Sequence, residues 1–245
     1  MNIRIVVTCI LVCIISLGFF YLQLNQPLTY AVGDQWVYEH KGPRPFKDPS
    51  VSLNGDRTRE IVRCETSDDK KVWVFRDEWG DPSQFTICYV DEKNECCRFE
   101  EENNVIIEND TPFPFEYRDL AVNETSEIIS HATMRGMQKL KLQISATRLS
   151  DEAVATPAGN FQNCRHIKKE STITDSSQTP PVVCTYTEDY WYHPSVNGFV
   201  KYELDFHPIH VGDVVVEGYK ASSELKQFIR GKGAEVKTIA REESA

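Results

Sequence analysis

The chain has 245 residues, a formal net charge of −10 at pH 7 and 40% hydrophobic residues. Lysine and arginine nowhere cluster with aromatic residues, so we predict no nucleic-acid partner. The acidity is typical of a solvated surface and identifies no ligand by itself. The roughly 190 residues after the N-terminal segment are enough to bury one hydrophobic core, and we predict one folded domain over residues 30–222.

The chain begins with a long apolar segment. No charged side chain lies between Arg4 and Asp34, and residues 5–24 are almost entirely apolar. About 20 such residues, at about 1.5 Å of helical rise each, span a bilayer core. The run exceeds the roughly 7 to 15 residues of a signal-peptide core and no small-residue cleavage motif follows it. We therefore predict a transmembrane anchor over residues 1–26, with a cleaved signal sequence as the alternative.

Arg4 is the charge that flanks this segment on its N-terminal side. The positive-inside tendency then places the N-terminus in the cytoplasm. The sequence predicts a single-pass membrane protein whose bulk is periplasmic or extracellular. Lipidation at Cys9 or Cys13 is the less favoured possibility, because neither follows the small residue that a lipidated cysteine requires.

Strand patterns dominate the rest of the chain. In residues 200–206 every second side chain is apolar and those between are charged, and residues 139–146 repeat this alternation. Further strands are predicted at 35–40, 59–64, 71–76, 84–90, 95–99, 105–108, 161–168, 182–192 and 214–220. Short strands separated by Gly, Pro, Asn and Asp turns predict a mainly antiparallel β fold with little helix.

Two segments depart from the strand pattern. Residues 110–120 combine prolines with three aromatic residues, and we predict that they cover the core in preference to forming a ligand lid. In residues 223–245, Leu225, Phe228 and Ile229 have the spacing of one helix face and Gly231 follows them. The sequence therefore predicts a short helix and then a polar tail.

Six of the eight cysteines follow the apolar segment. An even number in an exported chain predicts disulfides. The predicted pairs are Cys88 with Cys97, Cys164 with Cys184 and, by elimination, Cys64 with Cys96. Adjacent Cys96 and Cys97 are able to exchange partners. A zinc site that uses Cys88, Cys96 and Cys97, or Cys164 and His166, is the alternative, but the paired Cys-x2-Cys spacing of structural zinc is missing.

Catalytic motifs are not found. The sequence contains no Gly-x-Ser-x-Gly, His-Glu-x-x-His or phosphate-binding loop. His207 and His210, near Asp205, come nearest to a metal or acid–base cluster, yet their spacing matches no familiar zinc motif. We predict a protein that is not an enzyme, with no cofactor.

Three segments carry a family resemblance. Residues 30–38 read YAVGDQWVY, residues 156–164 read TPAGNFQNC, and residues 190–201 read YWYHPSVNGFVK. In this order they resemble motifs of the TapB-like and lipoprotein-carrier-like exported bacterial domains, with an extra Asn197 before the last glycine. The motif positions, to which we assign structural roles, are Gly33, Asp34, Trp36, Pro157, Gly159, Phe161, Cys164, Tyr192, Pro194, Gly198 and Val200.

The resemblance implies a strongly curved antiparallel half-barrel on the extracytoplasmic side of a membrane. Relatives that hold acyl chains in the concave face suggest a lipophilic ligand or a lipoprotein segment, lined here by Trp36, Trp73, Tyr190 and Tyr192. The first alternative is an envelope scaffold or assembly factor that presents sheet edges and loops to envelope proteins. The second is a metal or redox protein that uses its Cys and His residues.

Overall fold

The computed structural model describes residues 30–45, 53–67, 70–101, 105–134, 138–177, 179–211, 214–233 and 237–238. The predicted membrane anchor over residues 1–26 lies outside these ranges. Within them, no helix has both the length and the apolar character needed to cross a membrane.

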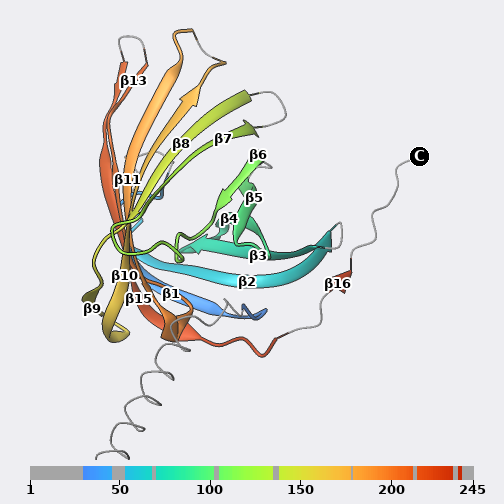
Figure 1. The fold of residues 1–245 in the computed structure, drawn as a ribbon, viewed down its shortest axis with the longest axis vertical. Helices are drawn as coiled ribbons and strands as arrows, with labels where there is room; N and C mark the ends of the chain where they lie inside the picture. The colour runs from blue at the N-terminus through green and yellow to red at the C-terminus, as the bar shows by residue number, and fades with distance from the viewer. Residues whose placement is uncertain are drawn as a thin grey trace, which may run out of the picture.

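The fold is an antiparallel β-barrel (Figure 1). Its strands are β1 (Gln35–Lys41), β2 (Gly55–Ser67), β3 (Lys70–Trp79), β4 (Asp81–Asp91), β5 (Glu95–Glu101), β6 (Val105–Pro114), β7 (Thr125–Met134), β8 (Gln138–Arg148), β10 (Gly159–Asp175), β11 (Val182–His193), β12 (Gly198–Phe206) and β15 (Tyr219–Ile229). Outside this ring, β9 (Glu152–Thr156) pairs with β10, β13 (Ile209–Val211) pairs with β14 (Val214–Val216), and β16 (Lys237–Thr238) lies parallel to β2.

The predicted open half-barrel is wrong, because the ring of twelve strands closes. Trp36 of β1 lies opposite Phe228 of β15 on one side and opposite Arg59 of β2 on the other. Bulges, seen as register shifts in β1, β2 and β11 among others, increase the local twist that such closure needs. The predicted antiparallel β class and the scarcity of helix are both confirmed.

The predicted helix near the C-terminus is also wrong. Residues 219–229 form β15, in which Ala221, Ser223 and Leu225 point inward at every second position. A helical spacing confined to one turn stabilises little by itself, whereas β15 gains backbone partners from β1 and β12 on its two sides. The one described helical element is the 3-10 turn η2 (Pro194–Val196).

The connection between β6 and β7 enters the barrel. Phe113 and Tyr117 belong to the hydrophobic core, and Glu116 and Arg118 are buried beside them. Asn94 donates a hydrogen bond to the Glu116 carbonyl at 2.7 Å. This confirms the prediction that residues 110–120 cover the core, although residues 110–114 do so as the end of a strand.

Candidate functional site

The predicted ligand-lining residues are engaged with other protein side chains. Trp36 is 1% exposed, lies against Phe75 and Phe228, and donates from Nε1 to the Val196 carbonyl at 2.7 Å. Tyr192 is buried with the Arg118 guanidinium 5.2 Å from its ring centroid. Their ring faces are therefore occupied by protein in the barrel interior.

The other two lining residues, Trp73 and Tyr190, are both partly exposed. Trp73 meets Tyr30 edge-on, with 5.9 Å between ring centroids. Tyr190 donates its hydroxyl proton to Glu188 at 2.7 Å, and the Lys169 ammonium lies 5.4 Å from its ring centroid. The four residues share the inner side of the sheet, but the structure does not bring them together as one apolar slot.

Charged residues fill the middle of the barrel. Asp77 of β3 accepts hydrogen bonds from Arg57 at 3.0 Å and from Arg59 at 2.8 Å, all three side chains being largely buried. Arg57 also lies 4.4 Å from the ring centroid of Trp79. Burial tends to raise the pKa of Asp77, but the two guanidinium charges outweigh burial and hold that pKa below its ordinary value.

Two more buried charge clusters flank this one. Arg118 pairs with Glu116, which accepts the hydroxyl proton of Tyr30 at 3.1 Å. On the opposite wall, Glu188 pairs with Lys169 and accepts from Tyr202 at 3.1 Å. Burial and then the Glu188 charge raise the pKa of Tyr202 well above its ordinary value, so this phenol stays neutral. An interior with this density of charge is a poor environment for an acyl chain.

A buried histidine makes stability depend on pH. Burial, followed by the nearby Arg57 charge, lowers the pKa of His40 from 6.5 to about 4. Between pH 6.5 and pH 4, the unfolded chain binds a proton at His40 that the folded protein does not bind. The contribution of His40 to the free energy of unfolding is therefore fully present above pH 6.5 and is lost as the pH falls toward 4. We expect a slope of up to about 1.4 kcal/mol per pH unit. His40→Gln is expected to reduce this slope in urea titrations at pH 7 and pH 5; equal slopes in both proteins would contradict it.

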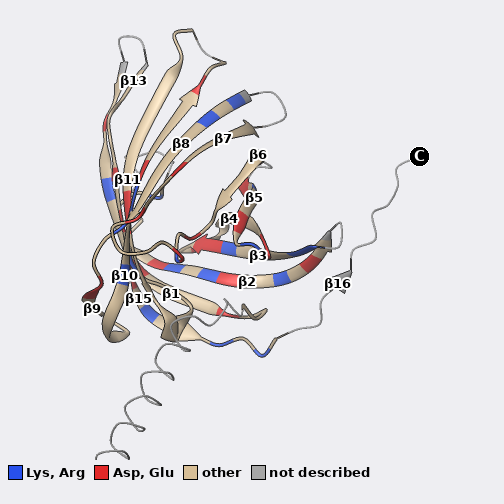
Figure 2. Ribbon diagram, viewed as in Figure 1, with Lys and Arg blue, Asp and Glu red and all other residues tan. Residues whose placement is uncertain are grey.

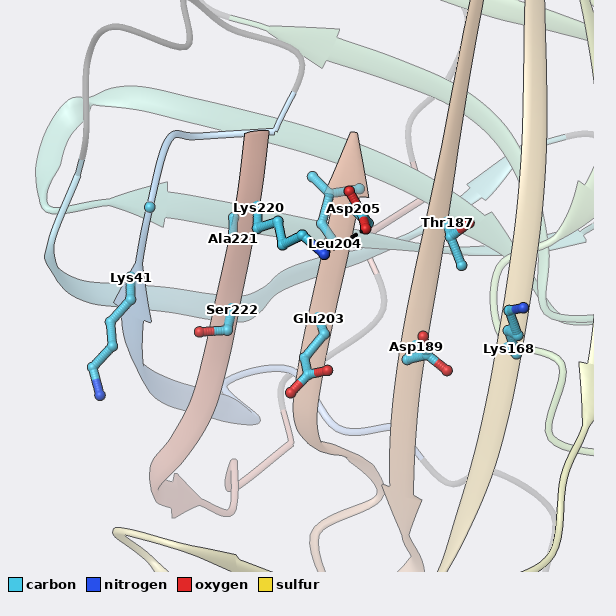
Figure 3. A pocket seen from close by; sticks show the side chains of 11 residues that line it. Lys41, Lys168, Thr187, Asp189, Glu203, Leu204, Asp205, Lys220, Ala221 and Ser222 are labelled. Carbon is cyan, nitrogen blue, oxygen red and sulfur yellow. Dashed lines mark ion pairs between the residues drawn. The ribbon is translucent and has the colours of Figure 1, made fainter. Parts of the chain in front are cut away.

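The outer face of the sheet is hollowed into two adjoining grooves. One, of about 710 Å³, crosses β1, β15, β12, β11 and β10, and the other, of about 700 Å³, continues over β7 and β8. Figure 3 shows charged side chains of the first groove on neighbouring strands. Thr187 lines both grooves, so together they form one polar depression across the sheet.

Most carboxylates of this depression already have cationic neighbours. Lys220 pairs with Asp205 at 2.7 Å, and Lys168 pairs with Glu170 at 2.8 Å. Lys201 pairs with Glu203 at 2.7 Å. A solvated, charge-balanced sheet surface explains this pattern without a ligand.

One polar cluster beside the grooves was not predicted from the sequence. His166 lies between Glu152, at 2.8 Å from Nδ1, and Asp189, at 2.6 Å from Nε2, and stacks on Trp191. Its partners come from β9 and β11, so no local pattern predicts the arrangement. His207 contacts Thr185 at 3.0 Å and does not join a cluster with His210. In the part of the chain that the structure describes, no three His, Cys, Asp or Glu residues are grouped as metal ligands.

The predicted disulfides are absent among the described cysteines, all of which are free. Cys184 lies opposite Ile173, about 30 Å along β10 from Cys164 at about 3.3 Å per residue, because β10 extends to Asp175, well beyond the strand predicted over residues 161–168. Two strands separate Cys64 from Cys96. A bulge at Cys97 leaves Cys96 as the neighbour of Cys88, with 3.1 Å between the sulfur atoms.

The motif residues gather at one end of the barrel. Asp34 is fully buried and accepts from the Ala31 and Gly231 amides at 3.0 and 2.8 Å, which joins the start of β1 to the end of β15. Gly198 faces the Trp36 indole. Gly33 directly precedes Asp34 and has a φ of 87°. The other positions occupy the β9–β10 turn (Pro157, Gly159), the wall of β10 (Phe161, Cys164) and the η2 corner with its flanking strands (Tyr192, Pro194, Val200).

The barrel has one weak seam, between β6 and β7. The two strands pair in register at three positions, Ile107 with Met134, Glu108 with Thr133 and Asn109 with Ala132. β8 instead follows β7 along its whole length, from Thr125 to Met134. Residues 125–129 of β7, here termed the β7 edge, therefore have a described strand partner on one side only, and β6 diverges from them in Figure 1.

Proline and acidic residues distinguish this seam. Pro112 and Pro114 lie on the diverging part of β6 and have no N–H to donate. Glu108, Asp110 and Glu127 are exposed on the outer side, and none of them forms an ion pair with any residue that the structure describes. Ile129 is 55% exposed beside them. This seam therefore combines an unpaired strand edge with carboxylates that have no described counter-ion.

Comparisons with known proteins assign this chain to no family. A scan against models of protein families gave no match, and neither did a search of curated proteins. The solved structures that match include a protein from Bacteroides fragilis assigned as exported, with a YmcC-like fold, at TM-score 0.46 and 13% identity, covering 81% of this chain and 96% of that chain. A protein from Parabacteroides distasonis assigned as a lipoprotein matches at TM-score 0.45 and 17% identity, covering 83% and 97%.

Proposed function

We propose that this protein is a non-enzymatic binding domain of the cell envelope that receives an extended, basic segment of a protein partner along the β7 edge. The observation that carries the proposal is the seam, where β7 keeps β8 on one side but leaves β6 after three residue pairs. An unpaired strand edge offers alternating N–H and C=O groups to an added strand, which is a common mode of peptide recognition.

The length of the β7 edge sets the length of the bound segment. Five residues at about 3.4 Å each give an edge of roughly 17 Å. The prolines of β6 leave few donors on the facing strand, so an incoming strand gains its backbone hydrogen bonds mainly from β7. Ile129, on the outer side of the edge, is available to an apolar side chain of the partner.

Charge favours a basic partner. Three carboxylates, those of Glu108, Asp110 and Glu127, surround the seam without a described counter-ion, whereas Glu170 and Asp205 of the outer grooves are paired with lysines. Figure 2 shows that acidic and basic residues are both spread over the strands of the barrel. Each lysine or arginine of the partner that approaches them gains an exposed ion pair. Such pairs accelerate association and are weakened by salt.

The lipophilic-ligand alternative is less well supported. Its expected lining includes Trp36 and Tyr192, whose ring faces are covered by protein side chains. Charge clusters around Asp77 and Glu188 occupy the interior. The apolar N-terminal segment of the sequence supports an extracytoplasmic site for the domain, held near the membrane surface.

The test uses a fluorescein-labelled hexapeptide of alternating lysine and valine as the probe and fluorescence anisotropy as the readout. We expect saturable binding that weakens with added salt and weakens at least tenfold when a central valine of the probe is proline. Ile129→Lys is expected to weaken binding at least tenfold, because it places a cation beside the basic probe. Ile229→Lys, at an isoleucine that is 42% exposed on β15, is the matched control and is expected to leave binding unchanged.

Two results would overturn the proposal. One is equal binding by the Ile129→Lys and Ile229→Lys proteins. The other is no peptide binding together with saturable uptake of a fluorescent fatty acid by the delipidated protein, which would restore the lipophilic-ligand alternative.

A further inference from the structure

The thiol groups of Cys88 and Cys96 lie next to each other in the barrel interior. Their sulfur atoms are 3.1 Å apart, and the two residues are 4% and 0% exposed. Cys88 is on β4 and Cys96 on β5, on either side of the turn formed by residues 92–94. A disulfide bond measures about 2.05 Å, so a shift of about 1 Å between the sulfur atoms brings them to bonding distance.

The register explains why these two residues meet. Cys88 lies opposite Phe99 and Cys96 lies opposite Val90, with the register shift that accommodates Cys97 between the two pairs. The bulge brings Cys96 to the inner side of the sheet together with Cys88, while Cys97 remains partly exposed and contacts the Glu95 carbonyl. Adjacent cysteines are thereby separated into one that faces Cys88 and one that does not.

We propose that Cys88 and Cys96 form a disulfide in the exported protein, which closes the β4–β5 hairpin covalently. The oxidant is the disulfide of a thiol–disulfide oxidoreductase. One cysteine thiolate attacks that disulfide and forms a mixed disulfide, and the thiolate of the other then displaces the oxidoreductase. In sum the two thiols lose two protons and two electrons, and the donor disulfide is reduced to two thiols.

Burial determines when this exchange takes place. Burial, and then the nearby Cys96, raises the pKa of the Cys88 thiol well above its ordinary value, so the folded and reduced barrel contains little of the reactive thiolate. Oxidation therefore precedes closure of the barrel around the hairpin. The bond also holds β6, because Cys96 lies opposite Phe113 and its carbonyl accepts from Asn109 at 3.1 Å. The proposed disulfide does not depend on the proposed peptide site.

Peptide mapping of the wild-type protein tests for the bond, and a Cys97→Ser variant identifies which of the two adjacent cysteines forms it. Full-length protein exported by its host is denatured in iodoacetamide without reductant and digested with trypsin, which separates residues 77–93, with Cys88, from residues 94–98, with Cys96 and Cys97. We expect these two peptides to be joined, two hydrogens lighter than their sum, and to separate on reduction. The joined species is expected to persist in Cys97→Ser protein, and Cys184 serves as the alkylated reference.

Either of two results would overturn the inference. In the first, Cys88 is alkylated to the same extent as Cys184 in the unreduced wild-type protein. In the second, the joined peptides form in the wild-type protein but disappear in the Cys97→Ser protein, which would assign the bond to Cys97.

Discussion

Replacing Asp77 with asparagine is expected to lower the free energy of unfolding by about 3 to 5 kcal/mol. Asp77 is 7% exposed and is the carboxylate that contacts both Arg57 and Arg59 inside the barrel. Its removal leaves two guanidinium groups buried without that counter-charge. Urea denaturation at pH 7 measures the loss.

The neighbouring Glu78→Gln change is the matched control. Glu78 pairs with Arg76 on the outer side, where both side chains are about one third exposed, and loss of such a pair costs about 0 to 1 kcal/mol. Replacing all three buried residues, as Arg57→Met, Arg59→Met and Asp77→Leu, is expected to recover most of the stability. A loss below about 1 kcal/mol for Asp77→Asn would show that the interior is hydrated and the charges are screened.

Replacing Gly231 with alanine is expected to destabilise the barrel by about 3 kcal/mol, through overpacking and the loss of a buried hydrogen bond. An added Cβ would lie 2.3 Å from the Val32 carbonyl oxygen and 2.5 Å from the Asp34 nitrogen, which are backbone atoms. To relieve this steric overlap, residue 231 must move away from Asp34, and the buried Asp34 carboxylate then loses the hydrogen bond from the residue 231 N–H. Thermal unfolding followed by circular dichroism measures the effect.

Gly55→Ala is the control for this prediction. Nothing lies within 4 Å of a Cβ added to Gly55, which begins β2. Alanine there is expected to change stability by less than about 1 kcal/mol. Similar melting temperatures for the two alanine variants would mean that the contact between residues 32–34 and Gly231 contributes nothing to the barrel.

Alternation of apolar and polar residues predicted most strands correctly because it depends on each strand alone. Residues 200–206 became β12 and residues 139–146 became β8, each with one inward face. The predicted C-terminal helix was wrong because its residues pair with distant strands, which a local pattern does not reveal. Leu225 and Phe228 have a helical spacing, but β1 and β12 provide strand partners that outweigh this local preference.

Features set by distant partners could not be predicted from the sequence. β10 extends to Asp175, and this length separates Cys164 from Cys184. A sequence pattern predicts that charged residues such as Arg57 and Asp77 are solvated. The pairing of β2 with β3 brings them together, and closure of the ring places them inside the barrel. The β7 edge also depends on where β6 diverges, for which Pro112 and Pro114 are the one local signal.

The most direct test of the proposed function is amide hydrogen exchange at residues 125–129, measured by NMR with and without the lysine–valine peptide. We predict that alternate amides of the β7 edge exchange rapidly in the free protein and at least tenfold more slowly at saturating peptide, with amides of β12 unchanged. Slow exchange of all five amides in the free protein would contradict the open edge. Protection confined to groove residues outside 125–129, with none at residues 125–129, would contradict the proposed site.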